Sequence, residues 1–290
     1  MTLEQLRIFI AVAERQHMTR GADAAHVTQS AASSAIAALE LRHGTQLFHR
    51  VGRGIELTEA GKLFLTEARA VLASAETAER LLEEFGDLRR GALRLVASQT
   101  IASYWLPARL ARFQQRYPQI EIRLSLDNSE GAAAKVVDGA AELGFIEGIV
   151  EAPALANWRV GEDRMLLVSA TPAGAIDAGW LRAARWIVRE RGSGTRSSFE
   201  DAARRLGLDP DAFEIGMTLP SNEAVRTAVE AGAGVAVLSE LVVRAAIATG
   251  RLQVLPFDLP ARPFFALRHK ERFRTHAADA FVTLLTEDDQ

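Results

Sequence analysis

The hydrophobic pattern of the chain changes near residue 91, and this change limits the possible folds more than any other feature. Before it, apolar residues recur mainly at the spacing of amphipathic helices. After it, short apolar runs typical of buried strands alternate with helical segments. Such alternation favours parallel sheets with helices on both faces, and about 200 residues suit two lobes better than one sheet. We therefore predict an all-α N-terminal part followed by a two-lobed α/β region.

The first 42 residues predict three short helices. Helical spacing of apolar residues indicates a first helix over residues 3–13, and Thr19 is the expected cap of a second helix that ends near Ala25. A short connection leads to a third helix over residues 29–42. Two helices separated by so short a connection, the second beginning with Gln and Ser, have the spacing of a helix-turn-helix.

A small hairpin is expected over residues 47–57. Gly52 and Gly54 permit a turn between two short apolar stretches, and Arg50 and Arg53 lie at its tip. A helix-turn-helix followed by a basic hairpin forms a winged module.

A long helix is predicted from Thr58 to about Leu88, with an apolar seam of period about 3.5 residues. This period favours pairing with a second helix along its length. The alternative is that the helix lies on its own domain, because alanines occupy several seam positions. The seam consists of Phe64, Ala68, Val71, Ala75, Ala78, Leu82 and Phe85.

Composition excludes several classes of protein. An apolar share of 48% and a charged share of 24% in 290 residues are ordinary for a chain that buries a core, which excludes extensive disorder. The net charge of −3 means that any nucleic-acid contact must use a local patch. The absence of cysteine excludes disulfides, thiolate metal sites and a cysteine nucleophile. Without a signal-peptide pattern or a long apolar run, we expect a cytoplasmic protein that does not enter membranes.

Polar residues at the start of the third helix and the hairpin arginines are the candidate DNA contacts. Gln can read an adenine edge, whereas Ser hydroxyls and helix N-terminal amides suit phosphates. Residues 1–62 carry seven Lys/Arg and six Asp/Glu, so the local positive charge is modest. The alternative is that the hydroxyls only cap the helix and the arginines are solvated. The candidates are Thr28, Gln29, Ser30, Ser33, Ser34, Arg50 and Arg53.

Three polar helix starts in the α/β region form a candidate ligand site. The first two follow predicted strands, and the carboxyl edge of a parallel sheet is where such folds bind ligands. A helix N-terminus favours an anion by about 0.3–1 kcal/mol. The alternative is that these residues are ordinary helix caps. The candidates are Ser98, Gln99, Thr100, Ser193, Gly194, Thr195 and Asn222.

Glu147, at the end of a predicted strand, is an added candidate and a difficulty for an anion site. Three roles are open to it. It can pair with Arg196, accept a hydrogen from the ligand, or point away from the site.

The sequence gives little support for catalysis. It lacks the zinc-protease, nucleophile-elbow and Walker motifs and has no dinucleotide fingerprint placed after a strand, so we expect no catalytic residue, metal site or cofactor. Two other classes stay open. One is a sensor whose N-terminal helices only contact protein. The other is an α/β enzyme with a regulatory module, which would need a catalytic pair near Ser98 or Ser193.

Residues 3–61 resemble the N-terminal module of LysR-type transcriptional regulators. The resemblance includes the Thr-Gln-Ser start of the recognition helix, the Leu-Phe-x-Arg turn and the Leu-Thr-x-Ala-Gly wing exit. It implies that Gln29, Ser33 and Ser34 face the major groove and that the hairpin arginines lie near phosphates and the minor groove. One departure is that many members have Pro and Arg where this chain has Ser30 and Ser34, which affects the base-reading pattern.

The same resemblance implies a domain organisation and partners. Residues 1–58 would be the winged helix-turn-helix, 59–89 a linker helix for dimerisation, and 90–290 an effector-binding domain like periplasmic binding proteins. Its first lobe would hold residues 91–160 and 266–290, and its second 161–265. The expected partners are promoter DNA, further copies of the chain as a homodimer or dimer of dimers, and RNA polymerase.

The effector region also resembles the sulfur-metabolism branch of this family that is often called CysL-like. The resembling runs are SQTIASYWLP, RYPQIEIRLSLDNSEGAAAKVVDGAAELGFIEG and RGSGTR. This resemblance implies a small-molecule effector that is an oxyanion or a carboxylate.

Overall fold

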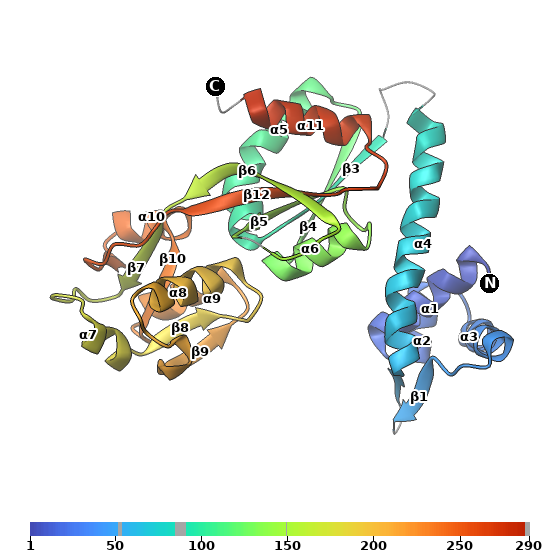
Figure 1. The fold of residues 1–290 in the computed structure, drawn as a ribbon, viewed down its shortest axis with the longest axis horizontal. Helices are drawn as coiled ribbons and strands as arrows, with labels where there is room; N and C mark the ends of the chain where they lie inside the picture. The colour runs from blue at the N-terminus through green and yellow to red at the C-terminus, as the bar shows by residue number, and fades with distance from the viewer. Residues whose placement is uncertain (52–53, 85–90, 149, 288–290) are drawn as a thin grey trace. The chain divides into compact units, whose positions relative to one another are not determined.

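The computed structural model describes residues 1–51, 54–84, 91–148 and 150–287 (Figure 1). They form two compact units, one within residues 1–86 and the other in most of the remaining chain. The predicted all-α N-terminal part and two-lobed α/β region are confirmed. No helix among the described residues has the length and apolarity needed to cross a membrane.

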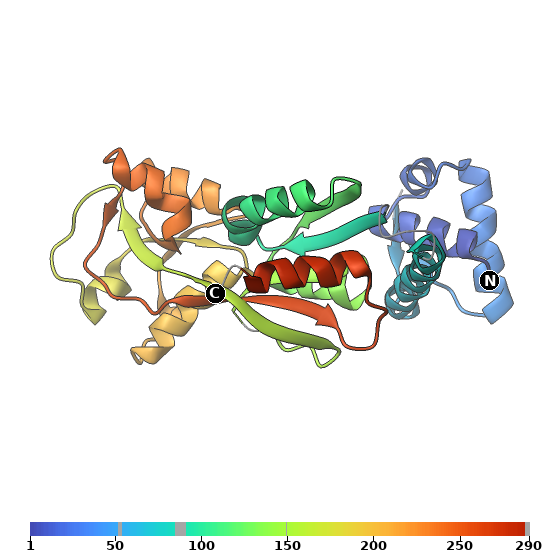
Figure 2. The ribbon, with the colours of Figure 1, turned by 90° about the horizontal axis from the view of Figure 1, so that it is seen from above.

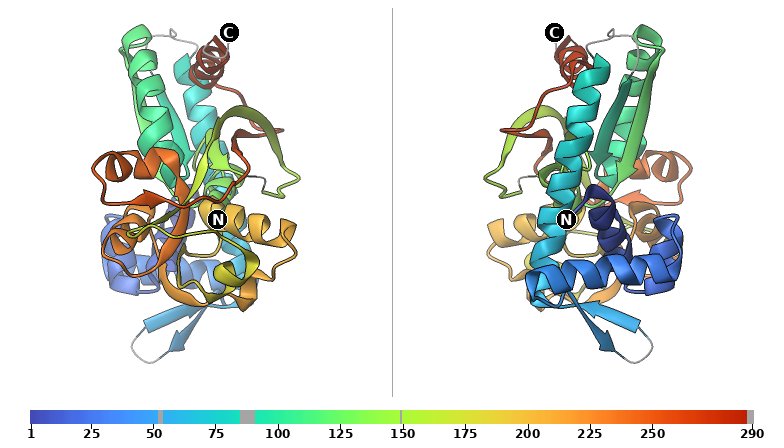
Figure 3. Two further views of the ribbon diagram at one scale, coloured as in Figure 1. Left: turned by 90° about the vertical axis from the view of Figure 1, so that its left-hand side faces the viewer. Right: turned by 90° about the vertical axis from the view of Figure 1, so that its right-hand side faces the viewer.

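The first unit is a winged helix-turn-helix followed by a long helix. Figure 3 shows its β-hairpin projecting from the three short helices of the same unit. The elements are α1 (Leu3–Arg15), α2 (Met18–Ala24), α3 (Gln29–His43), β1 (Phe48–Val51), β2 (Gly54–Leu57) and α4 (Glu59–Glu84).

Side-chain caps fix the starts of the short helices. Thr2 accepts a hydrogen bond from the Gln5 amide at 3.2 Å, and Gln5 Oε1 accepts one from the Thr2 amide at 2.9 Å, which closes a capping box on α1. The predicted Thr19 cap of α2 is wrong. The helix begins at Met18, so Thr19 lies inside the first turn, and His17 Nδ1 caps it by accepting from the Arg20 amide at 3.4 Å.

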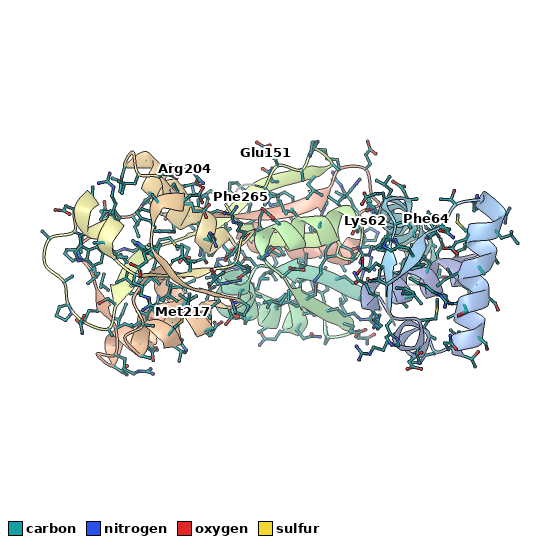
Figure 4. All side chains as sticks on the ribbon, turned by 90° about the horizontal axis from the view of Figure 1, so that it is seen from below. Lys62, Phe64, Glu151, Arg204, Met217 and Phe265 are labelled. Carbon is teal, nitrogen blue, oxygen red and sulfur yellow. The ribbon has the colours of Figure 1, made fainter. Side chains whose placement is uncertain are left out.

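The long helix α4 contributes to the core of its own unit. Phe64, labelled in Figure 4, stacks on Phe9 with ring centroids 4.8 Å apart, and Ala68 is only 1% exposed. At these two seam positions the helix lies on its own unit, as the alternative expected, with Ala68 buried and Phe64 partly buried against α1 and the hairpin. Pairing of this helix with a second copy stays a prediction. Val71 is 41% exposed, whereas the Leu82 side chain and all of Phe85 lie outside the described part of the chain.

The second unit contains two five-stranded sheets, one in each lobe (Figure 2). The first sheet has the order β4 (Ile120–Leu126), β3 (Gly91–Ala97), β5 (Leu143–Glu147), β12 (Arg262–His269), β6 (Leu155–Asp163). The second has the order β11 (Gln253–Val254), β7 (Met165–Ser169), β10 (Val235–Ser239), β8 (Trp186–Arg189), β9 (Ile215–Leu219).

Helices cover both faces of each sheet because strand residues alternate between the faces. In the first lobe, Leu95 packs with Phe113 of α5 (Leu106–Arg116) and with α11 (His276–Glu287), whereas Val96 packs with α6 (Ser129–Val137). In the second lobe, α7 (Ala178–Ala183) and α8 (Gly194–Arg205) cover one face, and α9 (Asn222–Glu230) and α10 (Glu240–Ala248) cover the other.

Both sheets are mixed rather than parallel. Strands β3, β4 and β5 are parallel as predicted, but β12 runs antiparallel to β5 and β6, and β7 runs antiparallel to β10. Strands β6 and β12, which were not predicted from the sequence, form a long antiparallel pair in the first sheet. Strand β6 ends at Asp163 and β12 begins at Arg262, a few residues beyond the predicted lobe limits.

The helical segment after β3 begins with a π-helical turn over Ile101–Trp105, which leads into α5. Leu106 donates its amide to the Ile101 carbonyl five residues earlier. Pro107, which follows, has no amide proton to continue the α-helical ladder through this point.

Candidate functional site

The start of α3 presents a row of polar side chains. Thr28 is the N-cap, and its hydroxyl accepts from the Ala31 amide at 3.2 Å and lies 3.0 Å from the Ser30 hydroxyl. Thr28 therefore caps the helix, as the alternative interpretation expected, whereas the Ser30 hydroxyl lies against that of Thr28 and bonds to no helix amide among the described residues. Gln29 is exposed, and its amide donates to the Ser33 hydroxyl at 3.5 Å. Ser34 is exposed on the same helix, opposite the buried face of Ala32, Ile36 and Leu39.

The hairpin is joined firmly to the end of α3. Glu40 Oε1 accepts from the amides of Leu47 at 2.7 Å and Phe48 at 3.2 Å, and the Thr58 hydroxyl donates to the Gln46 carbonyl at 2.8 Å. Arg50 is exposed on β1, and it forms no ion pair within the described residues. Arg53 lies outside the described residues. The recognition helix and hairpin therefore present their polar groups from one connected scaffold.

In the second unit, strand ends from both lobes meet in a buried polar cluster, which we call the interlobe cluster. Its members lie at the carboxyl ends of strands, at the helix starts that follow them, or at the first residue of β12 (Figure 1). They are Ser98, Gln99, Thr100, Ser129, Glu147, Asp163, Arg189, Thr195, Asn222, Glu223, Ser239 and Arg262.

Gln99 connects the two lobes. Its Oε1 accepts from Arg189 Nη1 at 2.8 Å and from the Asn222 amide at 2.7 Å. Its Nε2 donates to Glu223 Oε2 at 2.5 Å, and the Tyr104 hydroxyl donates to Glu223 Oε1 at 3.0 Å. Burial, followed by the hydrogen bond to Glu223, raises the pKa of Tyr104.

Asn222 extends this network into the core of the cluster. Its Nδ2 donates to the Thr100 hydroxyl at 3.0 Å, and its Oδ1 accepts from Arg189 Nη1 at 2.8 Å. Two further nitrogens of Arg189 donate to the two oxygens of Glu190, each at 2.8 Å. Burial opposes ionisation of Glu190, but the hydrogen bonds from Arg189 outweigh this effect and keep the pKa of Glu190 below its usual value. The charge of Arg189 is thus largely compensated.

Arg262 is the cation at the centre of the other half of the cluster. It is 3% exposed, and its Nη2 lies 2.6 Å from Asp163 Oδ2 and 3.8 Å from Glu147 Oε1. Its Nη1 donates to the Thr195 hydroxyl at 3.2 Å across the lobe boundary. Burial raises the pKa of Asp163 and Glu147 raises it further, although Arg262 acts in the opposite direction.

Glu147 lies inside the cluster rather than pointing away from it. It is 4% exposed, and its Oε2 accepts from the Ser129 hydroxyl at 3.1 Å. Of the three roles left open by the sequence, pointing away is thus not adopted, and neither is pairing with Arg196, because Arg196 Nε donates to Glu200 at 2.8 Å and its Nη1 to the Arg189 carbonyl at 3.1 Å.

Two buried polar atoms of the cluster have no hydrogen-bond partner among the described residues. They are Ser98 Oγ and Arg262 Nε, in side chains that are 2% and 3% exposed. The start of α8 is close by, because Thr195 in its first turn contacts Arg262. Ser193 is its N-cap residue, but the Ser193 side chain makes no capping hydrogen bond. Unsatisfied donors at this place can accommodate a small ligand with acceptor oxygens.

The structure brings most of the predicted ligand-site residues together. Gln99, Thr100 and Asn222 bond to one another, and Thr195 joins them through Arg262. Arg189, Arg262 and Asp163 were not predicted from the sequence. Arg189 carries a weak signal, because it ends a short apolar run a few residues before the candidates Ser193 and Gly194.

Comparisons with known proteins agree with both units. Residues 3–62 match the family of bacterial regulatory helix-turn-helix proteins of the lysR family, and residues 86–290 match the LysR substrate binding domain. The uncharacterized HTH-type transcriptional regulator YeiE of Escherichia coli (strain K12) is 34% identical over 288 residues, which are 97% of this chain and 96% of that protein.

Two solved structures share the fold. Full-length CbnR, complexed with its target DNA, aligns with a TM-score of 0.69 at 22% identity and covers 99% of both chains. The regulatory domain of CcmR from Synechocystis PCC6803, in complex with 2-PG, aligns with a TM-score of 0.60 at 23% identity, over 69% of this chain and 97% of that domain.

Proposed function

Because the chain belongs to the LysR family of DNA-binding transcriptional regulators, we propose that a small anion, bound between its two α/β lobes, controls its binding to promoter DNA. The observation that carries this proposal is the pair of unpartnered buried donors, Ser98 Oγ and Arg262 Nε, of which Arg262 contacts Thr195 at the start of α8. Ser98 Oγ, Arg262 Nε and the amides at the start of α8 can each donate a hydrogen bond to an acceptor oxygen, and burial strengthens such bonds.

The proposed effector is an oxyanion or a carboxylate. The structure of CcmR with 2-PG gives a precedent on the same fold for a small ligand of a regulatory domain. The CysL-like resemblance agrees with this class and stays a prediction. Because Gln99, Thr195 and Arg262 already bond across the lobe boundary, a ligand there alters contacts between the lobes. A shift between lobe arrangements of different ligand affinity would transmit binding to the DNA-binding unit.

For DNA, we propose that Gln29, Ser33 and Ser34 contact base edges, and that Thr28, Ser30, Arg50 and Arg53 contact the sugar–phosphate backbone. Among the described members, Thr28, Gln29, Ser30, Ser34 and Arg50 are exposed and Ser33 is half-buried, which fits this division. Bases specify the sequence and phosphates mainly position the protein, so the two groups should differ in their mutational effects.

We propose that the chain acts as an oligomer in the cytoplasm, with residues 1–58 binding DNA and 59–89 pairing with a second copy. Leu63 and Val71, which are 73% and 41% exposed on α4, offer apolar surface for this contact. RNA polymerase is the proposed recipient of the regulatory signal.

Ser98→Ala is the direct test of the anion site. Because Ser98 Oγ has no partner among the described residues, its removal should leave the unfolding temperature nearly unchanged. Affinity for the bound anion should fall about tenfold through loss of a hydrogen bond to a charged group. Calorimetric titration of the full chain with phosphate, sulfate and acetate measures this. If no anion binds the unchanged chain, the proposed effector class is wrong.

The DNA contacts are tested by Arg50→Ala and Gln29→Ala. Arg50→Ala should weaken binding to all sequences alike and reduce the slope of log affinity against log salt by about 1. Gln29→Ala should lower affinity for the specific promoter site about tenfold and leave binding to random DNA nearly unchanged. Titrations at several salt concentrations separate the two effects. Equal losses on specific and random DNA for both variants would contradict the division of roles.

A further inference from the structure

We infer, on the basis of the anion site proposed above, that Glu147 selects effectors that carry a proton. The bound anion has to carry a hydrogen, on a hydroxyl or on a protonated acid oxygen, which it donates to the Glu147 carboxylate.

Glu147 lies directly against the first turn of α8. A Cβ atom built on Gly194, the first residue of that helix, would lie 2.8 Å from both Glu147 Cβ and the Glu147 carbonyl oxygen. The same atom would lie 2.8 Å from the Ser129 hydroxyl. The absence of a side chain at Gly194 therefore lets the carboxylate-bearing strand β5 approach the proposed anion site closely.

One oxygen of Glu147 has spare capacity to accept a hydrogen bond. Its Oε2 accepts from Ser129, but Arg262 Nη2 is 3.8 Å from Oε1, which is too far for a hydrogen bond. No described residue donates a hydrogen bond to Oε1. A ligand that donates a hydrogen to this oxygen therefore gains a charge-assisted hydrogen bond.

The charge balance at this place favours such a ligand over a bare anion. Arg262 is shared by two carboxylates, and Asp163 holds it closely at 2.6 Å, with support from Ser239 at 2.9 Å. These three charged groups carry a net charge of −1. A fully deprotonated oxyanion would turn lone pairs toward Glu147 and be repelled. An anion with a hydrogen instead forms a charge-assisted O–H···O bond with it.

Anions fall into two classes, those that can donate a hydrogen to Glu147 and those that cannot. Hydrogen phosphate, protonated phosphate monoesters and hydroxy acids carry a suitable hydrogen. Sulfate and simple carboxylates without a hydroxyl group do not carry one near neutral pH. Glu147 therefore acts as a specificity-determining residue, and the Ser98 and Arg262 donors provide attraction common to both classes.

The test compares inorganic phosphate with sulfate, which have similar size and shape. In calorimetric titrations of the full chain near pH 7 at fixed ionic strength, phosphate should bind at least about tenfold more tightly than sulfate. In Glu147→Gln, the amide can donate to sulfate, so the ratio of the two affinities should fall below about threefold. The comparison in the unchanged chain needs no variant, so it stands even if Glu147→Gln folds poorly.

Glu223→Gln is the control for charge alone. Glu223 is a carboxylate at the same lobe boundary that bonds to Gln99 and Tyr104 and has no hydrogen bond to Glu147. Its removal should tighten both anions by the same factor and leave their ratio unchanged. Equal affinities of phosphate and sulfate for the unchanged chain would overturn the role of Glu147 but leave the anion site in place. Failure of both anions to bind would overturn the role of Glu147 together with the proposed function.

Discussion

Replacing Arg262 by methionine is expected to lower the free energy of unfolding of the second unit by about 3–5 kcal/mol. Arg262, Asp163 and Glu147 are all less than a twentieth exposed, and the two carboxylates share this one guanidinium. Methionine keeps much of the volume of the arginine side chain but leaves the carboxylates of Asp163 and Glu147 without their cation. All four tryptophans, Trp105, Trp158, Trp180 and Trp186, lie in this unit, so urea unfolding followed by tryptophan fluorescence reports on it directly.

The loss in Arg262→Met should be larger at pH 8 than at pH 5. Burial already raises the pKa of Asp163 above its unfolded value, and Arg262 opposes this rise. Removing Arg262 therefore raises that pKa further. A carboxyl with a raised pKa binds more protons in the folded state than in the unfolded state, so stability falls as the pH increases from the unfolded to the folded pKa.

Arg159→Met is the matched control for this prediction. Arg159 lies on β6, the strand that ends at Asp163, but its ion pair with Glu162 is exposed, with both side chains at least 60% accessible. An exposed pair contributes about 0–1 kcal/mol, so this variant should change little at either pH. Similar losses of unfolding free energy for Arg159→Met and Arg262→Met, or a loss in Arg262→Met that does not depend on pH, would contradict the conclusion that Arg262 compensates the two buried carboxylates.

Local sequence rules predicted that the cluster lies at the carboxyl ends of strands in the α/β region. Ser98 and Thr195 follow buried strands, Asn222 follows the more exposed strand β9, and residues at the carboxyl ends of neighbouring parallel strands meet at one edge. The structure brings such edges from two sheets together, which gives the bonds between Gln99 and Asn222 and between Thr195 and Arg262. This placement at the carboxyl edge depends only on strand direction, which the order of an apolar run and the helix start after it indicates in the sequence.

The charge partners could not be predicted in this way. Arg262 and Asp163 are 99 positions apart and meet because β6 and β12 pair in antiparallel register. The hydrophobic period does not report such pairing. Similarly, a period of 3.5 residues shows that one face of α4 is covered but not by which partner. Phe9 covers Phe64 from within the same chain, which spacing cannot distinguish from a second copy.

Gly21→Ala is expected to destabilise the first unit by about 2 kcal/mol, although the same substitution in an open helix would stabilise it by about 1 kcal/mol. Gly21 lies in α2, where it crosses α1. A Cβ atom there would lie 2.5 Å from both Cα and Cγ2 of Val12 and 2.8 Å from the Val12 amide nitrogen. Because backbone atoms of α1 cannot move aside, the two helices must separate. The cost of about 3 kcal/mol for such overpacking exceeds the gain in helix propensity.

The destabilisation by Gly21→Ala should be confined to the first unit, which contains no tryptophan. Hydrogen exchange of the α1 and α2 amides should accelerate about thirtyfold, as a loss of about 2 kcal/mol requires, and DNA affinity should fall. The tryptophan unfolding transition should stay in place. Gly54→Ala is the control, because a Cβ there would meet only the Gln16 and Val51 carbonyl oxygens, both at 3.7 Å, an ordinary contact distance. Unchanged or slower exchange in Gly21→Ala would show that α1 and α2 tolerate a wider crossing, so that close contact at Gly21 does not hold the helix-turn-helix together.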